Sequence, residues 1–300
     1  MNRRNFLKNS IATLLISSLG NWDISLASTT SAWRIKPYPP TFQTGTIGLL
    51  KLKPPCQVDD IKARFDKKEL LVFPTDTPKT WPYSCLVPVP LKAKAGKKII
   101  TFRAITPHDT LIYSYKLSIK KKKYPKEFLK VKKKYAEFPP AILKRVRADQ
   151  AAVGKACRAV TPTIYWHGPF IKPVPGRVTS PFGLQRYFNG QPRSPHSGMD
   201  LAAPIGTPVA ASNSGKVVLT RDCYLSGKTL ILDHGGGLFT LYCHLSKFKA
   251  NPGDITDKGQ TIALSGKSGR ITGPHLHWGV SLLGSRLDPQ SLLDISRFLA

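Results

Sequence analysis

Two histidines separated by a single leucine stand near the end of this chain, in the segment GPHLHW, residues 273–278. The chain has only 7 histidines in 300 residues, so two of them at this spacing are conspicuous. In a β-strand, side chains at i and i+2 leave the same face, about 6.6 Å apart along the strand. His275 and His277 would then point into one small space. Chance alternation on a solvent-facing strand is the alternative, and the other motifs must decide between them.

Two further segments carry the same kinds of side chain. The segment SPHSGMD places His196 four residues before Asp200, and LYCHLS carries His244 inside an expected strand. A catalytic zinc site uses three protein ligands and leaves the fourth position to water, and imidazole nitrogen and carboxylate oxygen are suitable donors. His196, Asp200 and one histidine of the His-x-His pair would provide such a set, with one zinc ion per chain.

Two imidazoles would remain beside the open position without binding metal. Zinc lowers the pKa of bound water to about 7 and polarises a carbonyl group. Neighbouring imidazoles can orient or deprotonate that water and stabilise the developing oxyanion. The predicted reaction class is therefore hydrolysis of an amide.

These motifs resemble those of the lysostaphin/LytM-type zinc endopeptidases, which cut peptide bonds in bacterial peptidoglycan. The resemblance covers roughly residues 165–290 and rests on SPFGLQRYFNGQPRSPHSGMDLAAPIGTPVAAS, LYCHLS and GPHLHWGV, in the family's order. It implies that His196, Asp200 and His277 bind zinc, and that His275 and His244 act on the water and the oxyanion. It also implies a compact antiparallel sheet with a groove floored by these strands.

A non-enzymatic reading of the same resemblance stays open. Some proteins with this fold have lost ligands and instead activate cell-wall amidases. The retention of all five residues favours a peptidase. The export context described below favours the D-alanyl–diaminopimelate crosslink over pentaglycine as the bond that is cut.

The first 32 residues are expected to form a secretory signal peptide. Arg3, Arg4 and Lys8 precede a short apolar run, and small residues offer cleavage sites near residues 27 or 32. The segment RRNFLK resembles a twin-arginine signal, and ordinary secretion is the alternative. We expect a protein exported to the periplasm or cell envelope, without stable membrane insertion after cleavage.

The formal net charge of +29 indicates an anionic partner. Nucleic acid is the usual first candidate for a basic protein, but an exported protein meets peptidoglycan and anionic envelope polymers first. We therefore expect no nucleic acid partner. The densest basic tract, KKKKYPKEFLKVKKKY at residues 120–135, suits such a contact or a solvated linker.

The elements that must position the site indicate a mainly β fold. Short β-type runs at residues 43–123 predict an N-terminal immunoglobulin-like β-sandwich, similar to a domain of some Gram-negative members. Residues 124–164 predict a basic linker and a connecting helix that starts at Pro139–Pro140. The helix carries an apolar stripe of Ile142, Val146, Val153, Cys157 and Val160. Residues 165–300 predict the antiparallel β-sheet of the zinc peptidase domain.

Five cysteines in an exported chain predict at least one disulfide. We expect Cys56 to pair with Cys85, consider a bridge between Cys223 and Cys243 on neighbouring strands, and leave Cys157 free. Cys243 is not expected to be a nucleophile beside His244, because strand neighbours point to opposite faces. In DHGGG, residues 233–237, His234 is expected to order a hairpin.

Overall fold

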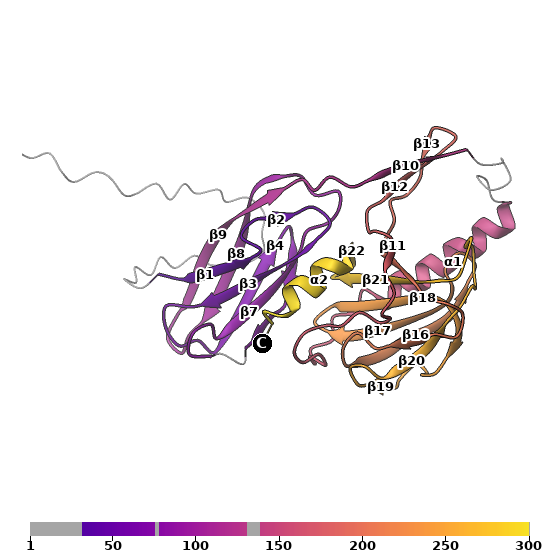
Figure 1. Cartoon of the computed structure of the whole chain (residues 1–300). Helices are drawn as coiled ribbons and strands as arrows, with labels where there is room; N and C mark the ends of the chain where they lie inside the picture. Colours follow the sequence, from indigo (N-terminus) through magenta and orange to yellow (C-terminus); the bar gives the residue numbers. More distant parts are fainter. Residues whose placement is uncertain (1–31, 76–77, 131–138, 300) are drawn as a thin grey trace, which may run out of the picture.

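The computed structural model describes residues 32–75, 78–130 and 139–299. The expected signal sequence falls almost wholly outside these residues and stays a prediction. The predicted mainly β fold is confirmed, since the described residues form 22 strands and two helices (Figure 1). None of the described helices is long and apolar enough to cross a membrane.

Two sheets form the N-terminal half. The first has the order β1-β3-β7-β6 and the second the order β2-β9-β8-β4-β5. Their strands are β1 (Arg34–Tyr38), β2 (Phe42–Gln43), β3 (Ile47–Lys53), β4 (Asp60–Phe65), β5 (Lys68–Leu70), β6 (Val72–Pro74), β7 (Tyr83–Pro88), β8 (Gly96–Ile105) and β9 (Thr110–Lys120). Residues 69–73, with the mostly apolar sequence ELLVF, do not form a single strand, because the chain passes from the second sheet to the first at Leu71.

The first sheet is buried on both faces. Leu50 and Leu52 of β3 point into the core between the two sheets, whereas Ile47 and Leu49 join the core of the C-terminal half. This two-sided burial is the reason that β3 carries large apolar residues on both faces rather than on one face only. The core of the C-terminal half therefore continues onto the first N-terminal sheet, while the two N-terminal sheets enclose a core of their own.

A short C-terminal helix, α2 (Pro289–Ser296), lies at this junction (Figure 1). Asp288 caps it by accepting a hydrogen bond from the Gln290 amide, and also forms an ion pair of 2.7 Å with Lys122. The amide of Ile47 in β3 donates to the Ser291 hydroxyl at 3.0 Å. These polar contacts fix the orientation of the N-terminal half on the C-terminal half.

A ten-stranded, antiparallel sheet dominates the C-terminal half. Its main path runs β11-β14-β21-β18-β17-β16-β19, β20 pairs with β15 and β18, and β22 pairs with β21. The strands are β11 (Val178–Ser180), β14 (Met199–Ala202), β15 (Pro208–Ala210), β16 (Gly215–Cys223), β17 (Gly227–Gly235), β18 (Leu238–Phe248), β19 (Ile255–Thr256), β20 (Thr261–Ser265), β21 (His275–Leu282) and β22 (Ser285–Leu287).

The connecting helix α1 (Pro140–Ala156) packs against one face of this sheet (Figure 1). Val153 and Cys157 contact Leu241 and its neighbours, and Asp149 forms an ion pair of 2.8 Å with Arg221 of β16. The helix starts at the predicted proline pair, but it ends at Ala156. Val160 therefore lies beyond it and is 58% exposed, so this last position of the predicted stripe was wrong.

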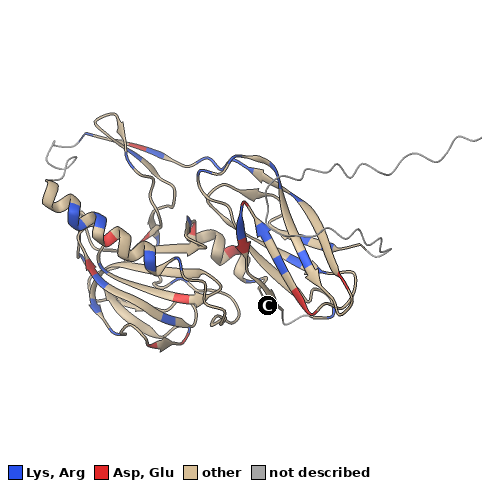
Figure 2. Ribbon diagram, turned by 180° about the vertical axis from the view of Figure 1, so that it is seen from behind, with Lys and Arg blue, Asp and Glu red and all other residues tan. Residues whose placement is uncertain are grey.

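Part of the basic linker forms a strand that the sequence did not predict. β10 (Lys126–Leu129) pairs in parallel with β12 (Gln185–Phe188), which pairs with β13 (Gln191–Pro192). Arg186 and Glu127 form an ion pair of 2.8 Å across this small sheet. Other lysines and arginines are spread over the N-terminal sheets and along α1 (Figure 2). The part of the linker after Lys130 lies outside the described residues as far as residue 138.

The predicted disulfide was wrong, since all five cysteines are free thiols. Cys56 is exposed, whereas Cys85 is fully buried in the core between the two N-terminal sheets. Cys223 and Cys243 are not on neighbouring strands either, because β17 lies between β16 and β18. A disulfide needs two Cβ atoms about 3.8 Å apart, and the spacing of cysteines along a sequence does not reveal that separation.

Candidate metal centre

Three adjacent strands bring the predicted site together. In the antiparallel ladders, Asp200 of β14 lies opposite His277 of β21, and His277 lies opposite Cys243 of β18. Residues directly opposite each other in such a ladder project to the same face of the sheet. The β-strand spacing inferred for the His-x-His pair is therefore real, and both histidines begin the same strand.

His196, Asp200 and His277 form a tight triangle. His196 Nε2 lies 3.0 Å from Asp200 Oδ1 and 3.0 Å from His277 Nδ1, and the third side, from His277 Nδ1 to Asp200 Oδ1, is 2.9 Å. Two ligands of a tetrahedral zinc ion, each about 2.0–2.1 Å from the metal, stand roughly 3.3 Å apart. The triangle fits such an ion within a few tenths of an ångström.

The hydrogen bonding of His196 leaves its Nε2 atom available to a cation. Its Nδ1 lies 2.9 Å from the carbonyl oxygen of Pro181, which can only accept a hydrogen bond, so Nδ1 carries the proton. In the neutral ring Nε2 then holds a lone pair, and this lone pair faces the Asp200 carboxylate and a nitrogen of His277. A cation at the centre of the triangle would have Asp200 Oδ1 and two imidazole nitrogens as its ligands.

Burial tunes the charge states of these groups. Burial alone would raise the pKa of the Asp200 carboxyl, but its contacts with His196 and His277 outweigh burial and lower the pKa well below its usual value. Burial lowers the pKa of His277, so its imidazole is neutral at pH 7. An ionised carboxylate and neutral imidazoles are the forms that bind metal.

His275 stands beside the triangle but is less close to its members. Its Nε2 is 3.6 Å from Asp200 Oδ1, compared with 2.9 Å for His277. Its Nδ1 donates to the carbonyl oxygen of Gly273 at 2.9 Å, which leaves the Nε2 lone pair facing the metal centre. This geometry leaves His275 Nε2 free to accept a hydrogen bond or a proton beside the triangle.

His244 reaches the same space through an irregularity in β18. Its backbone has φ of +62°, in the left-handed region, where a regular strand would be extended. The ring packs at 4.9 Å from His275 and 6.1 Å from His277, between centroids. Its Nδ1 donates to the Ser268 carbonyl at 2.9 Å. Burial lowers the pKa of His244 to about 4, so the ring is neutral with its Nε2 unprotonated.

The same irregularity overturns the predicted orientation of Cys243. Cys243 and His277 line one cavity, and His244 packs near His277, so both residues of the Cys-His pair reach the same side of the sheet. Cys243 is still no nucleophile, for another reason. Burial raises the pKa of its thiol to about 11, and the thiolate is the reactive form.

His234 belongs to the main core and not to this site. It is fully buried, with Nδ1 donating to the Ser214 carbonyl at 2.8 Å and Nε2 within 2.8 Å of the Thr240 hydroxyl. Burial lowers its pKa to about 4. The ring ties the end of β17 to β18, in keeping with the expected role in ordering the hairpin.

Gly198 contributes to the site through its missing side chain, and sequence analysis did not single it out. A Cβ at this position would lie 2.7 Å from His277 Nε2 and 2.5 Å from the Trp278 carbonyl oxygen. The position of this glycine between His196 and Asp200 is the feature of the sequence that could have indicated its role. The carbonyl groups that orient the other histidines carry no such signal, because any residue supplies one.

We expect Gly198→Ala to weaken metal binding by about tenfold to a hundredfold, because the added methyl group displaces the His277 ring. Zinc affinity measured by competition with a chromophoric chelator checks this. Gly273→Ala is the matched control, since a Cβ at Gly273 would meet no atom within 4 Å. Equal affinities for the two variants would contradict the expected displacement.

Comparison with known proteins shows which family these residues are similar to. The model of peptidase family M23 matches residues 194–289, which include all five residues discussed above. The peptidoglycan DD-endopeptidase ShyA of Vibrio cholerae is 43% identical over 109 residues, which are 36% of this chain and 25% of that protein. The DD-carboxypeptidase/endopeptidase Mpg of Neisseria meningitidis serogroup B is 37% identical over 116 residues, or 39% of this chain and 27% of that protein. The matched part thus spans about a quarter of these relatives' length.

One solved structure is similar over most of the chain. A Pseudomonas aeruginosa protein assigned to peptidase M23 has a TM-score of 0.65 and 29% sequence identity, over 86% of this chain and 96% of that chain. This coverage is larger than the C-terminal half. The likeness therefore extends to the N-terminal sheets.

Proposed function

We propose that the protein is an exported zinc endopeptidase, on the premise that residues 194–289 match the model of peptidase family M23. Its substrate in this proposal is the peptide crosslink of bacterial peptidoglycan. The observation that carries the proposal is the triangle of His196, Asp200 and His277, with the unprotonated nitrogens of two more histidines beside it.

In this proposal His196, Asp200 and His277 hold one zinc ion, which supplies a Lewis acid that polarises a peptide carbonyl and a water molecule. His275 and His244 carry their protons on Nδ1, toward carbonyl oxygens, so their Nε2 atoms are free to accept a proton from the attacking water. The imidazolium formed in this way can then donate to the developing oxyanion or to the leaving nitrogen.

The substrate assignment rests on two supports. ShyA is named a peptidoglycan DD-endopeptidase and Mpg a DD-carboxypeptidase/endopeptidase, and the net charge of +29 suits an anionic polymer such as the cell wall. A location in the periplasm or cell envelope follows from the proposed substrate and from the expected signal sequence. The amidase-activating alternative has no observation in its favour, because none of the five residues is replaced.

Digestion of purified sacculi tests the proposed function. The mature protein should release uncrosslinked stem peptides, with a new amine and a new carboxyl group at the former crosslink, as identified by mass spectrometry. Because the reaction requires the metal, a chelator should stop the release, and added zinc should restore it. Sacculi left intact unless an amidase is added would contradict the proposal and support the regulator.

A further inference from the structure

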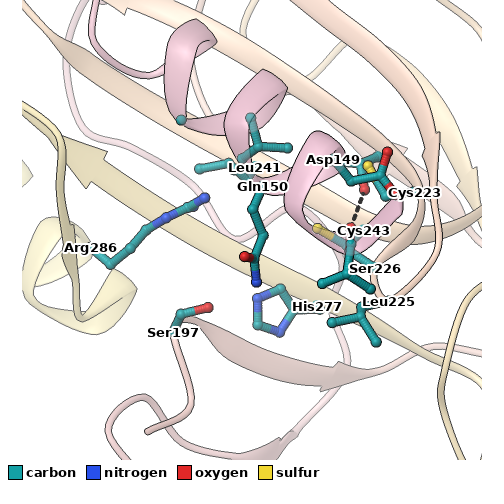
Figure 3. A pocket seen from close by; sticks show the side chains of 14 residues that line it. Asp149, Gln150, Ser197, Cys223, Leu225, Ser226, Leu241, Cys243, His277 and Arg286 are labelled. Atoms are coloured by element: carbon teal, nitrogen blue, oxygen red, sulfur yellow. Dashed lines mark hydrogen bonds between the residues drawn. The ribbon is translucent and has the colours of Figure 1, made fainter. Parts of the chain in front are cut away.

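A cavity of about 410 Å³ lies directly beside the candidate metal centre, between the sheet and α1. Its floor is formed by β18, β21 and the end of β16, and its roof by one face of α1, including Val146, Gln150 and Val153. His277 lines it, so the cavity and the metal centre share a side chain (Figure 3). Gln150 and Ser197 are exposed, which places the cavity's opening next to the centre.

Arg286 of β22 is the notable side chain of this cavity. It is half-buried, and the described residues offer its guanidinium group no hydrogen bond or ion pair. Gly279 leaves room for it, since a Cβ there would lie 3.3 Å from the guanidinium Nη1. Figure 3 shows Gln150 extending toward His277 and Arg286 extending toward Leu241 and Gln150. A half-buried cation without a hydrogen-bond or ion-pair partner is unfavourable unless a bound ligand provides one.

The other charges around the cavity are already balanced. The Asp149 carboxylate pairs with Arg221 at 2.8 Å and accepts a hydrogen bond from the Tyr224 amide at 2.8 Å. It is therefore not a partner for Arg286. The thiols of Cys223 and Cys243 also line the cavity, and burial raises the pKa of both, so they add no negative charge near pH 7.

We propose that this cavity is a carboxylate-binding subsite of the peptidase, in which Arg286 binds a free carboxylate of the crosslinked peptide. The inference rests on the proposed function, because it takes the substrate to be a peptide cut at the metal centre. A guanidinium group binds a carboxylate through two parallel hydrogen bonds. The diaminopimelate residue of a crosslink offers such a carboxylate on the carbon that bears the scissile nitrogen, and the stem's C-terminus offers another.

Synthetic crosslinked stem peptides test the subsite. One peptide has both carboxylates free, a second has the carboxylate beside the scissile amide converted to carboxamide, and a third has the C-terminal one converted. Arg286→Gln should raise KM for the free peptide by about tenfold to a hundredfold, the usual effect of losing a charged hydrogen-bond pair. The same substitution should leave KM unchanged for the peptide in which the carboxylate recognised by Arg286 is a carboxamide. The peptide with the unchanged KM therefore identifies which of the two carboxylates Arg286 binds.

Lys144→Gln is the matched control, because Lys144 is an exposed cation on the side of α1 that points away from the cavity. It should change no KM value by more than about twofold. Zinc content and the melting temperature of Arg286→Gln should equal those of the wild type. A loss of activity that is equal for all three peptides would overturn the subsite.

Binding measurements separate this inference from the proposed function. Calorimetry with the zinc-loaded His275→Ala protein compares binding of the peptides. The peptide with both carboxylates free should bind about tenfold more tightly than the peptide whose recognised carboxylate is a carboxamide. Adding Arg286→Gln should remove that difference. A difference in binding without any hydrolysis by the wild type would preserve the subsite and refute the peptidase. Equal binding of all peptides would refute the subsite.

Discussion

His277→Ala should abolish zinc binding and reduce peptidoglycan hydrolysis by at least about a thousandfold. His277 supplies one of the three donor atoms of the triangle, and its Nδ1 is within 3.0 Å of both of the others. With two ligands left, the site has no closed set of donors for a tetrahedral ion. Metal analysis of the purified protein should find about one zinc per wild-type chain and almost none in the variant.

A stability measurement checks the same assignment without reference to activity. A ligand that binds only the folded state at a thousand times its dissociation constant stabilises that state by about 4 kcal/mol. A chelator should therefore lower the melting temperature of the wild type and leave that of His277→Ala unchanged. His167→Ala, at an exposed histidine outside the motifs, should behave as the wild type does. Full zinc content in His277→Ala would rule out His277 as a ligand.

The parts of the site that sequence analysis predicted depend on local periodicity. The His-x-His pair lies on one face of a strand because the strand repeat is two residues, whatever the rest of the fold does. The mainly β architecture likewise follows from runs of apolar and β-branched residues between turns. Zinc chemistry suggested grouping His196 and Asp200 with one histidine of the pair, and the choice of His277 came from the resemblance. The sequence itself does not give the distance between residues that lie far apart along it.

The features that were missed or wrong depend on long-range contacts. The left-handed backbone of His244 has no strong local cause, since histidine is not a residue that demands it. The left-handed conformation is favoured because it places the His244 ring between His275 and the Ser268 carbonyl. β10 forms in a lysine-rich linker only because β12 provides a partner edge. Pairing of Cys56 with Cys85 failed because β7 buries Cys85 inside the sandwich.

The position of α1 also could not be predicted from its own sequence. The apolar stripe correctly indicated a helix packed by one face, but not which surface it covers. The helix is held over the face of the sheet that carries His277 by Asp149, whose carboxylate binds both Arg221 and the Tyr224 amide. Asp149 is a buried acidic residue on an otherwise basic helix, and the pattern of apolar residues does not reveal its contacts.

His275→Ala should retain about one zinc ion per chain and lose hydrolysis by about a hundredfold to ten-thousandfold, the usual contribution of a positioned acid or base. His275 Nε2 is 3.6 Å from Asp200 Oδ1, further than either proposed histidine ligand, so its removal leaves the triangle intact. We expect the loss in kcat rather than in KM, because a proton acceptor acts on the attacking water and not on substrate binding.

The same result is expected for His244, with a different choice of substitution. His244→Asn is preferred to alanine, because asparagine tolerates the left-handed backbone that position 244 requires. Hydrolysis should fall by a similar factor while zinc content and melting temperature stay close to those of the wild type. Loss of zinc from either variant would make that histidine a ligand. Undiminished kcat with zinc bound would remove it from the proton transfers, and the two measurements together decide between the roles.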